Sequence, residues 1–198
     1  KLAPKSAADF AFVQHMIYHM DTDGRIAVLL PHGVLFRGNA EETIRKYIVK
    51  DLNYLDAVIG LPANCFQGTS IPVCCLVLKR ERNGNSNNIC FIDASKYYTQ
   101  GKAQNSISQE DIDRIVNAYT ERKDIDKFCH IATMEEIEEN DYNLNIPRYV
   151  DTFEPEPEVD LQEVANDIRK VQAEIKDIDK DLKPFFDELG LDFPFGEK

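Results

Sequence analysis

Apolar and polar positions follow one another along the chain in blocks that predict helices and strands in turn. Apolar residues at helical spacing from Phe10 to Met20 predict a first helix, with Ser6 and Asp9 as a capping pattern. The continuous apolar run at 25–30 predicts a strand buried on both faces. A helix, a turn and a buried strand in this order are typical of an α/β sheet.

Three more apolar runs predict strands at 54–61, 71–78 and 89–93. The polar stretch 80–88 separates the last two and contains Asn-Gly, a pair that indicates a hairpin-type turn. Residues 141–150 have no regular period and predict an extended, loop-like segment. These runs predict a sheet with several strands.

Two further helices have start signals. Asn39, with Glu42 three residues later, predicts a helix that runs to about Lys50. Ser108, with Asp111 three residues later, predicts another, whose apolar residues follow at helical spacing.

The tail has the most regular pattern in the chain. Glu154-Pro-Glu-Pro-Glu158 predicts a stiff acidic linker, and we expect domains at 1–150 and 161–198 joined by a linker at 151–160. Pro184 is expected to end or kink the helix that follows. Its apolar stripe, alternating by three and four, comprises Leu161, Val164, Ile168, Val171, Ile175, Ile178, Leu182, Phe185 and Leu189.

This heptad stripe has two interpretations. The helix either folds back onto an apolar groove of its own domain or pairs with helices of another polypeptide. The strict spacing over about four heptads favours a partner.

Charge separates the tail from the rest of the chain. Of the 35 acidic and 23 basic residues, 15 and 6 lie at 151–198, so the tail carries a net charge of -9 out of -12. The 43% hydrophobic content is that of a soluble globular protein. Affinity for phosphate backbones comes largely from Lys and Arg, so the acidic balance argues against solitary DNA binding.

The cysteines and histidines predict no metal site. Five cysteines form no C-x-x-C pair, and a reduced, cytoplasmic protein is the simplest interpretation. Cys74 and Cys75 are adjacent in a predicted strand and should face opposite sides of the sheet. His15 and His19 share a helix face, but H-E-x-x-H is absent.

No run approaches the length of a membrane span, and the start at Lys1 suggests a fragment.

Two loops after predicted strands are candidate sites, because ligands bind beyond the carboxyl ends of strands in open α/β sheets. In the loop at 61–71, Phe66 is suited to stack on an extruded base, or it fills core beneath the loop. Cys65 has no feature that would lower its pKa and is expected to pack. His32, in the loop at 31–38, lacks an identifiable orienting carboxylate for a general base.

Three segments at these positions carry a resemblance. Leu29-Leu-Pro-His-Gly-Val-Leu-Phe-Arg-Gly38, Ala57-Val-Ile-Gly-Leu-Pro-Ala-Asn-Cys-Phe-Gln-Gly-Thr-Ser-Ile-Pro72 and Tyr142-Asn-Leu-Asn-Ile-Pro-Arg-Tyr-Val-Asp151 resemble the modification subunit of type I restriction-modification systems. The acidic linker and heptad helix are also similar to that family. The resemblance therefore covers almost the whole chain.

The resemblance implies N6-adenine methylation of DNA, with S-adenosylmethionine as methyl donor. It implies the C-terminal part of a Rossmann-like methyltransferase sheet, followed by a long helix. The strand-end loop near the active site contains Pro31, His32 and Gly33. The loop for the flipped adenine contains Phe66, Gly68, Thr69, Ile71 and Pro72.

The family's donor-binding glycine turn and its Asn-Pro-Pro-Phe or Asn-Pro-Pro-Tyr tetrapeptide are absent. We therefore expect no catalytic residue, no bound donor and no activity in this chain alone. The resemblance implies that the 161–182 stripe docks on a specificity subunit, in a complex with a second methyltransferase subunit and a restriction subunit that together contact DNA. Two alternatives stay open: a non-catalytic helical assembly module, and a methyltransferase for RNA or protein.

Overall fold

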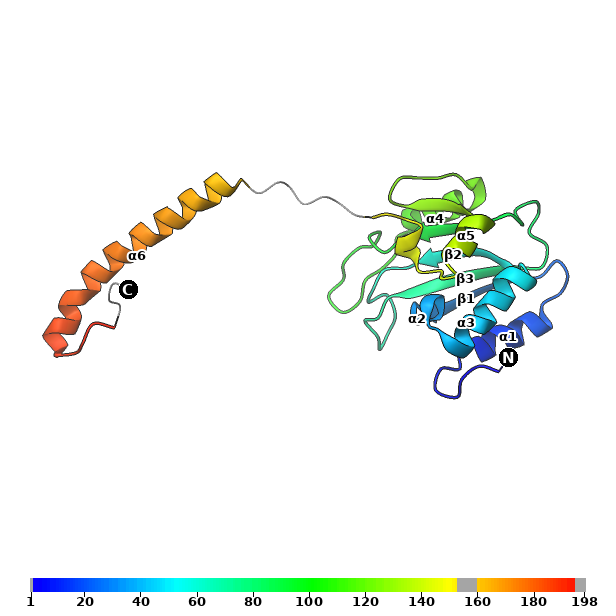
Figure 1. The fold of residues 1–198 in the computed structure, drawn as a ribbon, viewed down its shortest axis with the longest axis horizontal. Helices are drawn as coiled ribbons and strands as arrows, with labels where there is room; N and C mark the ends of the chain where they lie inside the picture. Colours follow the sequence, from blue (N-terminus) through cyan, green and yellow to red (C-terminus); the bar gives the residue numbers. More distant parts are fainter. Residues whose placement is uncertain (1, 153–159, 195–198) are drawn as a thin grey trace. The chain divides into compact units, whose positions relative to one another are not determined.

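The computed structural model describes residues 2–152 and 160–194 (Figure 1). The chain divides into two units, Lys1–Phe153 and Glu154–Lys198, and each is described by itself. Most of the predicted linker, at 153–159, lies outside the described residues. No helix in the described ranges is long and apolar enough to cross a membrane.

One sheet of five strands organises the first unit, in the order β1-β3-β2-β4-β5. Only β2 and β4 are parallel neighbours, and the other three pairs are antiparallel, so the sheet is mixed. The first four strands confirm the predicted ones, whereas the fifth was not predicted. The strands are β1 (Arg25–Pro31), β2 (Leu55–Gly60), β3 (Val73–Lys79), β4 (Asn88–Asp93) and β5 (Cys129–Thr133).

The hairpin predicted at 80–88 is wrong. Asn83 and Gly84 do form a turn, with φ of 49° and 84°. However, β2 lies between β3 and β4, so the connection passes from one neighbour of β2 to the other. Turn chemistry is local, but strand pairing is decided by distant residues.

The strand expected to be buried on both faces is an edge strand. β1 alternates between exposed and half-buried residues, and the side chain of Leu29 is 47% exposed. The strand that is buried at every position is β2, in the centre of the sheet. The continuous apolar run at 25–30 thus predicted a strand correctly, but its predicted burial on both faces is wrong.

Helices cover both faces of the sheet. One hydrophobic cluster contains residues of β1–β5 together with residues of α1, α3 and α5, and the other contains α4. Cys74 and Cys75 belong to opposite clusters, which confirms their predicted alternation. The elements are α1 (Asp9–His19), α2 (Gly33–Phe36), α3 (Asn39–Lys46), the π-helical η1 (Tyr47–Asp51), α4 (Gln109–Glu121), α5 (Met134–Glu139) and the 3-10 turn η2 (Ile146–Arg148).

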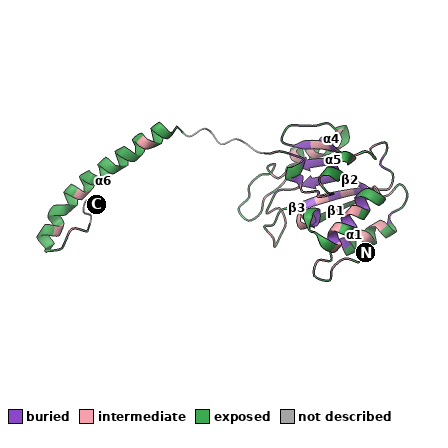
Figure 2. Ribbon diagram, viewed as in Figure 1, coloured by how far each residue is buried: buried purple, intermediate pink, exposed green. Residues whose placement is uncertain are grey.

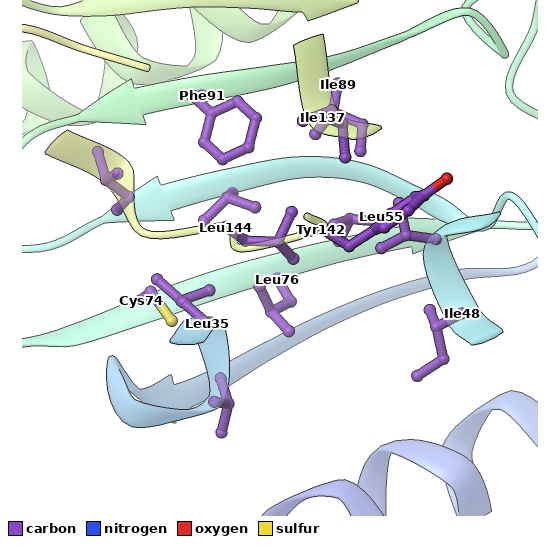
Figure 3. Close-up of a cluster of buried hydrophobic side chains, with 14 of the residues drawn as sticks. Leu35, Ile48, Leu55, Cys74, Leu76, Ile89, Phe91, Ile137, Tyr142 and Leu144 are labelled. Carbon is purple, nitrogen blue, oxygen red and sulfur yellow. The ribbon is translucent and has the colours of Figure 1, made fainter. Parts of the chain in front are cut away.

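The first cluster is the larger part of the core (Figures 2 and 3). Figure 3 shows Leu35, Leu76 and Leu144 drawn together from α2, β3 and the segment after α5. The segment 141–150, predicted to be loop-like, therefore supplies core residues, and Phe91 stacks on Tyr149 with ring centroids 3.9 Å apart.

The helix starts were predicted with mixed success. The Ser108 side chain accepts a hydrogen bond from the backbone N–H of Asp111, and the Asp111 carboxylate accepts one from the backbone of Ser108, as predicted. Asn39 makes no capping bond: it has φ of 60°, and Gly38 precedes α3 as the capping residue. Ser6 does not cap α1 either, which begins at Asp9 after Ala8.

A buried ion cluster joins β2, β3 and the end of α4. Asp56 in β2 is fully buried, and its carboxylate lies 3.0 Å from Lys79 Nζ and 3.3 Å from both Arg82 Nε and Arg122 Nη1. The Tyr119 hydroxyl donates a fourth contact. Burial opposes ionisation, but these hydrogen bonds and charges hold the pKa of Asp56 below its ordinary value.

We expect Asp56→Ala to lower the free energy of unfolding by about 3–5 kcal/mol, because it removes the carboxylate that neutralises three neighbouring cations and leaves them unpaired. Urea unfolding at pH 7 measures the change. Asp126→Ala is the matched control, since Asp126 is exposed, and should change stability by less than about 0.5 kcal/mol. Equal effects of the two substitutions would contradict the role of the cluster.

His130 in β5 is held by two carboxylates. Its Nδ1 lies 3.0 Å from Asp124 and its Nε2 lies 2.9 Å from Glu136. Burial alone would lower the pKa of His130, because it disfavours the charged ring. The hydrogen bond and charge of Glu136, together with Asp124, outweigh this effect and raise the pKa of His130 above its ordinary value.

A raised folded-state pKa stabilises the fold fully below the unfolded value of about 6.5, and this stability is lost as pH rises through the folded value. Thermal unfolding should therefore show a larger loss for His130→Gln at pH 6 than at pH 8.5. His15→Gln, at an exposed position on α1, serves as the control. A loss for His130→Gln that is the same at both pH values would exclude this contribution.

Candidate functional site

The strands that precede the candidate loops have their carboxyl ends at the same end of the sheet. Pro31 pairs with Val73, and Gly60 pairs with both Cys74 and Asp93. Because β1, β2 and β4 all end here, the segments that follow them start at the same end of the sheet, and those after β2 and β4 start from neighbouring strands. Two of these segments were predicted, namely 32–38, which contains the short helix α2, and 61–72; the third, 94–107, was not.

The loop at 61–72 has an ordered backbone. The Leu61 N–H donates to the Val73 carbonyl at 2.9 Å and closes the base of the loop. At the tip, the Thr69 N–H donates to the Phe66 carbonyl, and Gly68 takes φ of 83°. This left-handed conformation favours glycine, so the Gly68 position predicted from the sequence has a definite backbone role.

Phe66 is half-buried and belongs to neither hydrophobic cluster. The interpretation that it fills core is therefore not supported. It lines an open cleft of about 410 Å³ together with Gly68, Thr69, Ala103 and Gln104. The other two predicted loop residues, Ile71 and Pro72, are exposed.

Cys65, next to Phe66, has no activated thiol. Burial raises its pKa above the ordinary value for cysteine, which opposes thiolate formation. Its Sγ lies 3.7 Å from the Ala63 carbonyl. A nucleophilic role is thus unsupported, as the sequence indicated.

The loop at 31–38 is fixed by a buried arginine. Arg45 donates to the carbonyls of Val34 at 3.1 Å and Arg37 at 2.9 Å, and also to that of Tyr142 at 2.9 Å. Charged guanidinium donors satisfy loop carbonyls strongly. The two segments that resembled the family at 29–38 and 142–151 are therefore joined in space.

The predicted residues of this loop have different environments. Pro31 is exposed at the end of β1, and His32 is half-buried, with Nε2 shielded and without a hydrogen-bond partner in the described structure. A Cβ on Gly33 would lie 2.5 Å from the Arg37 guanidinium. That guanidinium lies 3.4 Å from the carboxylates of Asp9 and Glu41, so bulk at Gly33 would disturb this ion pairing.

The second unit presents the predicted stripe on one long helix, α6 (Leu161–Leu189). The Asp160 side chain caps its start, and the helix continues through Pro184 to Leu189. Of the two predicted effects of Pro184, an end of the helix is therefore wrong, and a kink stays a prediction. No described residue of α6 is buried (Figure 2). Exposed fractions run from 36% to 79% over the stripe, which comprises Leu161, Val164, Ile168, Val171, Ile175, Ile178, Leu182, Phe185 and Leu189.

Comparison with known proteins assigns the family. The profile of the N-6 DNA Methylase family matches residues 1–158. The chain belongs to the N-6 DNA methylase family. The resemblance to type I modification subunits is confirmed by the relatives of the chain as well.

Two curated relatives are the type I restriction enzyme MpnII methylase subunit of Mycoplasma pneumoniae and the MjaVIII methylase subunit of Methanocaldococcus jannaschii. They are 36% and 38% identical to this chain, over 96% and 93% of it. The matches cover 36% and 32% of those proteins, so this N-6 DNA methylase chain spans about a third of their length.

Solved structures agree with this assignment. The crystal structure of a type I restriction-modification methyltransferase subunit from Streptococcus thermophilus is 58% identical, with a TM-score of 0.73 over 76% of this chain and 32% of that one. The EcoKI M protein, at 20% identity and a TM-score of 0.59, shares the fold.

Sequence reasoning missed the segment 99–106. Thr99 and Ser106 exchange two backbone hydrogen bonds of 2.8 and 3.0 Å, which close this segment into a loop beside 61–72. Its polar run Gln104-Asn105 was the available signal, but such residues are common in solvated loops.

Proposed function

We propose that this chain is the C-terminal part of the modification subunit of a type I restriction-modification system, which methylates N6 of adenine in DNA. Its sheet belongs to the Rossmann-like methyltransferase domain, and its edge carries the target-base loop. The observation that supports this most directly is Phe66: a half-buried aromatic on an ordered loop that lines an open cleft at the strand ends.

An adenine turned out of the duplex exposes both of its ring faces. An aromatic side chain stacks on such a face whatever the neighbouring sequence, and Phe66 is placed to do so beside Gly68 and Thr69. The ordered backbone of the loop limits the entropy that base binding would cost. In this proposal the loop at 31–38, with His32 and Gly33, belongs to the same site because it starts at the same end of the sheet.

The methyl donor in this proposal is S-adenosylmethionine, which supplies the methyl group that is transferred. The resemblance implies that a glycine turn and an Asn-Pro-Pro-aromatic tetrapeptide form the donor site and the catalytic site, and this sequence lacks both. Methyl transfer therefore needs residues outside these 198, and the contribution of this chain is to hold the base.

In the complete modification subunit with its specificity subunit, Phe66→Ala should lower kcat/KM for adenine methylation by about 5- to 150-fold, since base–aromatic stacking is worth about 1–3 kcal/mol. Transfer of labelled methyl groups to a duplex with one target site measures this. Phe66→Tyr should keep most of the activity, because it keeps the ring.

Phe12→Ala is the matched control, since Phe12 is an aromatic residue on α1 that is 65% exposed. It should leave methylation unchanged. Undiminished activity of Phe66→Ala would exclude the stacking role, and transfer to RNA or protein instead of DNA would favour the alternative substrate classes.

We infer that α6 docks on the specificity subunit. Its stripe leaves large apolar side chains exposed at a 3–4 spacing, which is the pattern of a helix that pairs with other helices. In the assembled enzyme a second modification subunit and a restriction subunit join, and the assembly grips DNA. The tail's net charge of -9 suits a protein partner better than a phosphate backbone.

Val171→Asp should weaken association with the specificity subunit by at least tenfold, because it buries a charge in the helix interface. Gln172→Asp adds the same charge one residue away, off the stripe, and should have little effect. Size-exclusion chromatography with light scattering measures both. If removal of 159–198 leaves assembly intact, the docking role is wrong; if assembly needs the tail but methylation never occurs, the chain is an assembly module.

A further inference from the structure

Three consecutive carbonyls just before Phe66 accept hydrogen bonds from one neighbouring loop. Asn105 Nδ2 donates to the Ala63 carbonyl at 2.9 Å, and the Asn105 backbone N–H donates to the Asn64 carbonyl at 2.8 Å. Gln104 Nε2 donates to the Cys65 carbonyl at 2.8 Å. The donors are two adjacent residues of the 99–106 loop.

These bonds replace the ones that a sheet or helix would supply. Residues 63–65 lie outside the named strands, so their carbonyls need other donors. A side-chain amide brings its own donor group and reaches a carbonyl across a loop. The backbone hydrogen bonds between Thr99 and Ser106 join the two ends of the 99–106 loop and limit its motion.

The position of these bonds argues for more than general packing. Gln104 is exposed, so it stabilises no core, yet its amide bonds to the carbonyl of the residue directly before Phe66. Gln104 and Ala103 also line the same cleft as Phe66. The 99–106 loop therefore both bonds to the 61–72 loop and contributes residues to the cleft that Phe66 lines.

We propose that Gln104 and Asn105 are positioning residues, which hold the 63–65 backbone so that Phe66 is presented to the extruded base in one orientation. This inference deepens the proposed function, on which its link to adenine rests. The contacts themselves belong to this chain and can be tested without methylation.

The chain contains no tryptophan, so Phe66→Trp places a single fluorescent reporter on the 61–72 loop. Gln104→Glu and Asn105→Asp keep the side-chain size but remove the donating amide. In this reporter background, time-resolved anisotropy should show larger and faster indole motion for both. Gln100→Glu is the matched control: it makes the same change in the same loop, at an exposed residue, and should leave the indole motion unchanged.

In the complete subunit with Phe66 restored, Gln104→Glu and Asn105→Asp should each lower kcat/KM on duplex DNA by about five- to tenfold, the value of one hydrogen bond. The loss should shrink when the target adenine is mismatched, because less free energy is then needed to extrude it. Unfolding midpoints should stay close to that of Gln100→Glu.

Equal indole motion in Gln104→Glu, Asn105→Asp and Gln100→Glu would overturn the positioning role, whatever the enzyme does. Increased motion with undiminished methylation would overturn the link to adenine and leave the contacts standing. Loss of methylation in Phe66→Ala alone, with no effect of either amide variant on activity or motion, would support the proposed function and reject this inference.

Discussion

The insertion of β3 between β1 and β2 is the constraint on which the rest of this structure depends. β3 runs antiparallel to both neighbours, and β2 then pairs in parallel with β4. This arrangement makes β1, β2 and β4 end at one end of the sheet, where both candidate loops and the 94–107 segment begin. A simple hairpin of β3 with β4 would have paired these strands directly and moved β2 out of the centre.

The sheet keeps its stability and its candidate chemistry at opposite ends. Asp56, near the start of β2, ties β2, β3 and α4 together through buried ion pairs, while Gly60 at the end of β2 leads into the loop of Phe66. A loop that must admit a ligand cannot be buried in the core. The hydrogen bonds from 99–106 order the 61–72 loop while its tip stays open to the cleft.

Charge is divided along the chain in a way that suits a protein working within an assembly. Residues 1–150 are close to neutral. The C-terminal tail, which contains α6, combines acidic residues with an exposed apolar stripe. An acidic, amphipathic helix is a poor ligand for DNA and a good one for another helix. The net charge of the whole chain therefore says little about the substrate of the sheet domain.

Sequence alone determined what depends on local pattern. Heptad spacing predicted α6, Ser108 and Asp111 predicted the start of α4, and alternation placed Cys74 and Cys75 on opposite faces. It also selected the loop of Phe66 as a candidate site, because the residue order there resembles that of a known family. Only the tertiary structure decided that β1 is an edge strand, that β5 exists, that Asn39 does not cap α3, and that Gln104 and Asn105 bond to the 61–72 loop. The reason is physical: period and capping arise among residues a few positions apart, whereas strand order and loop–loop hydrogen bonds join residues some 40 positions apart, as Ala63 and Asn105 are, and no local pattern encodes them.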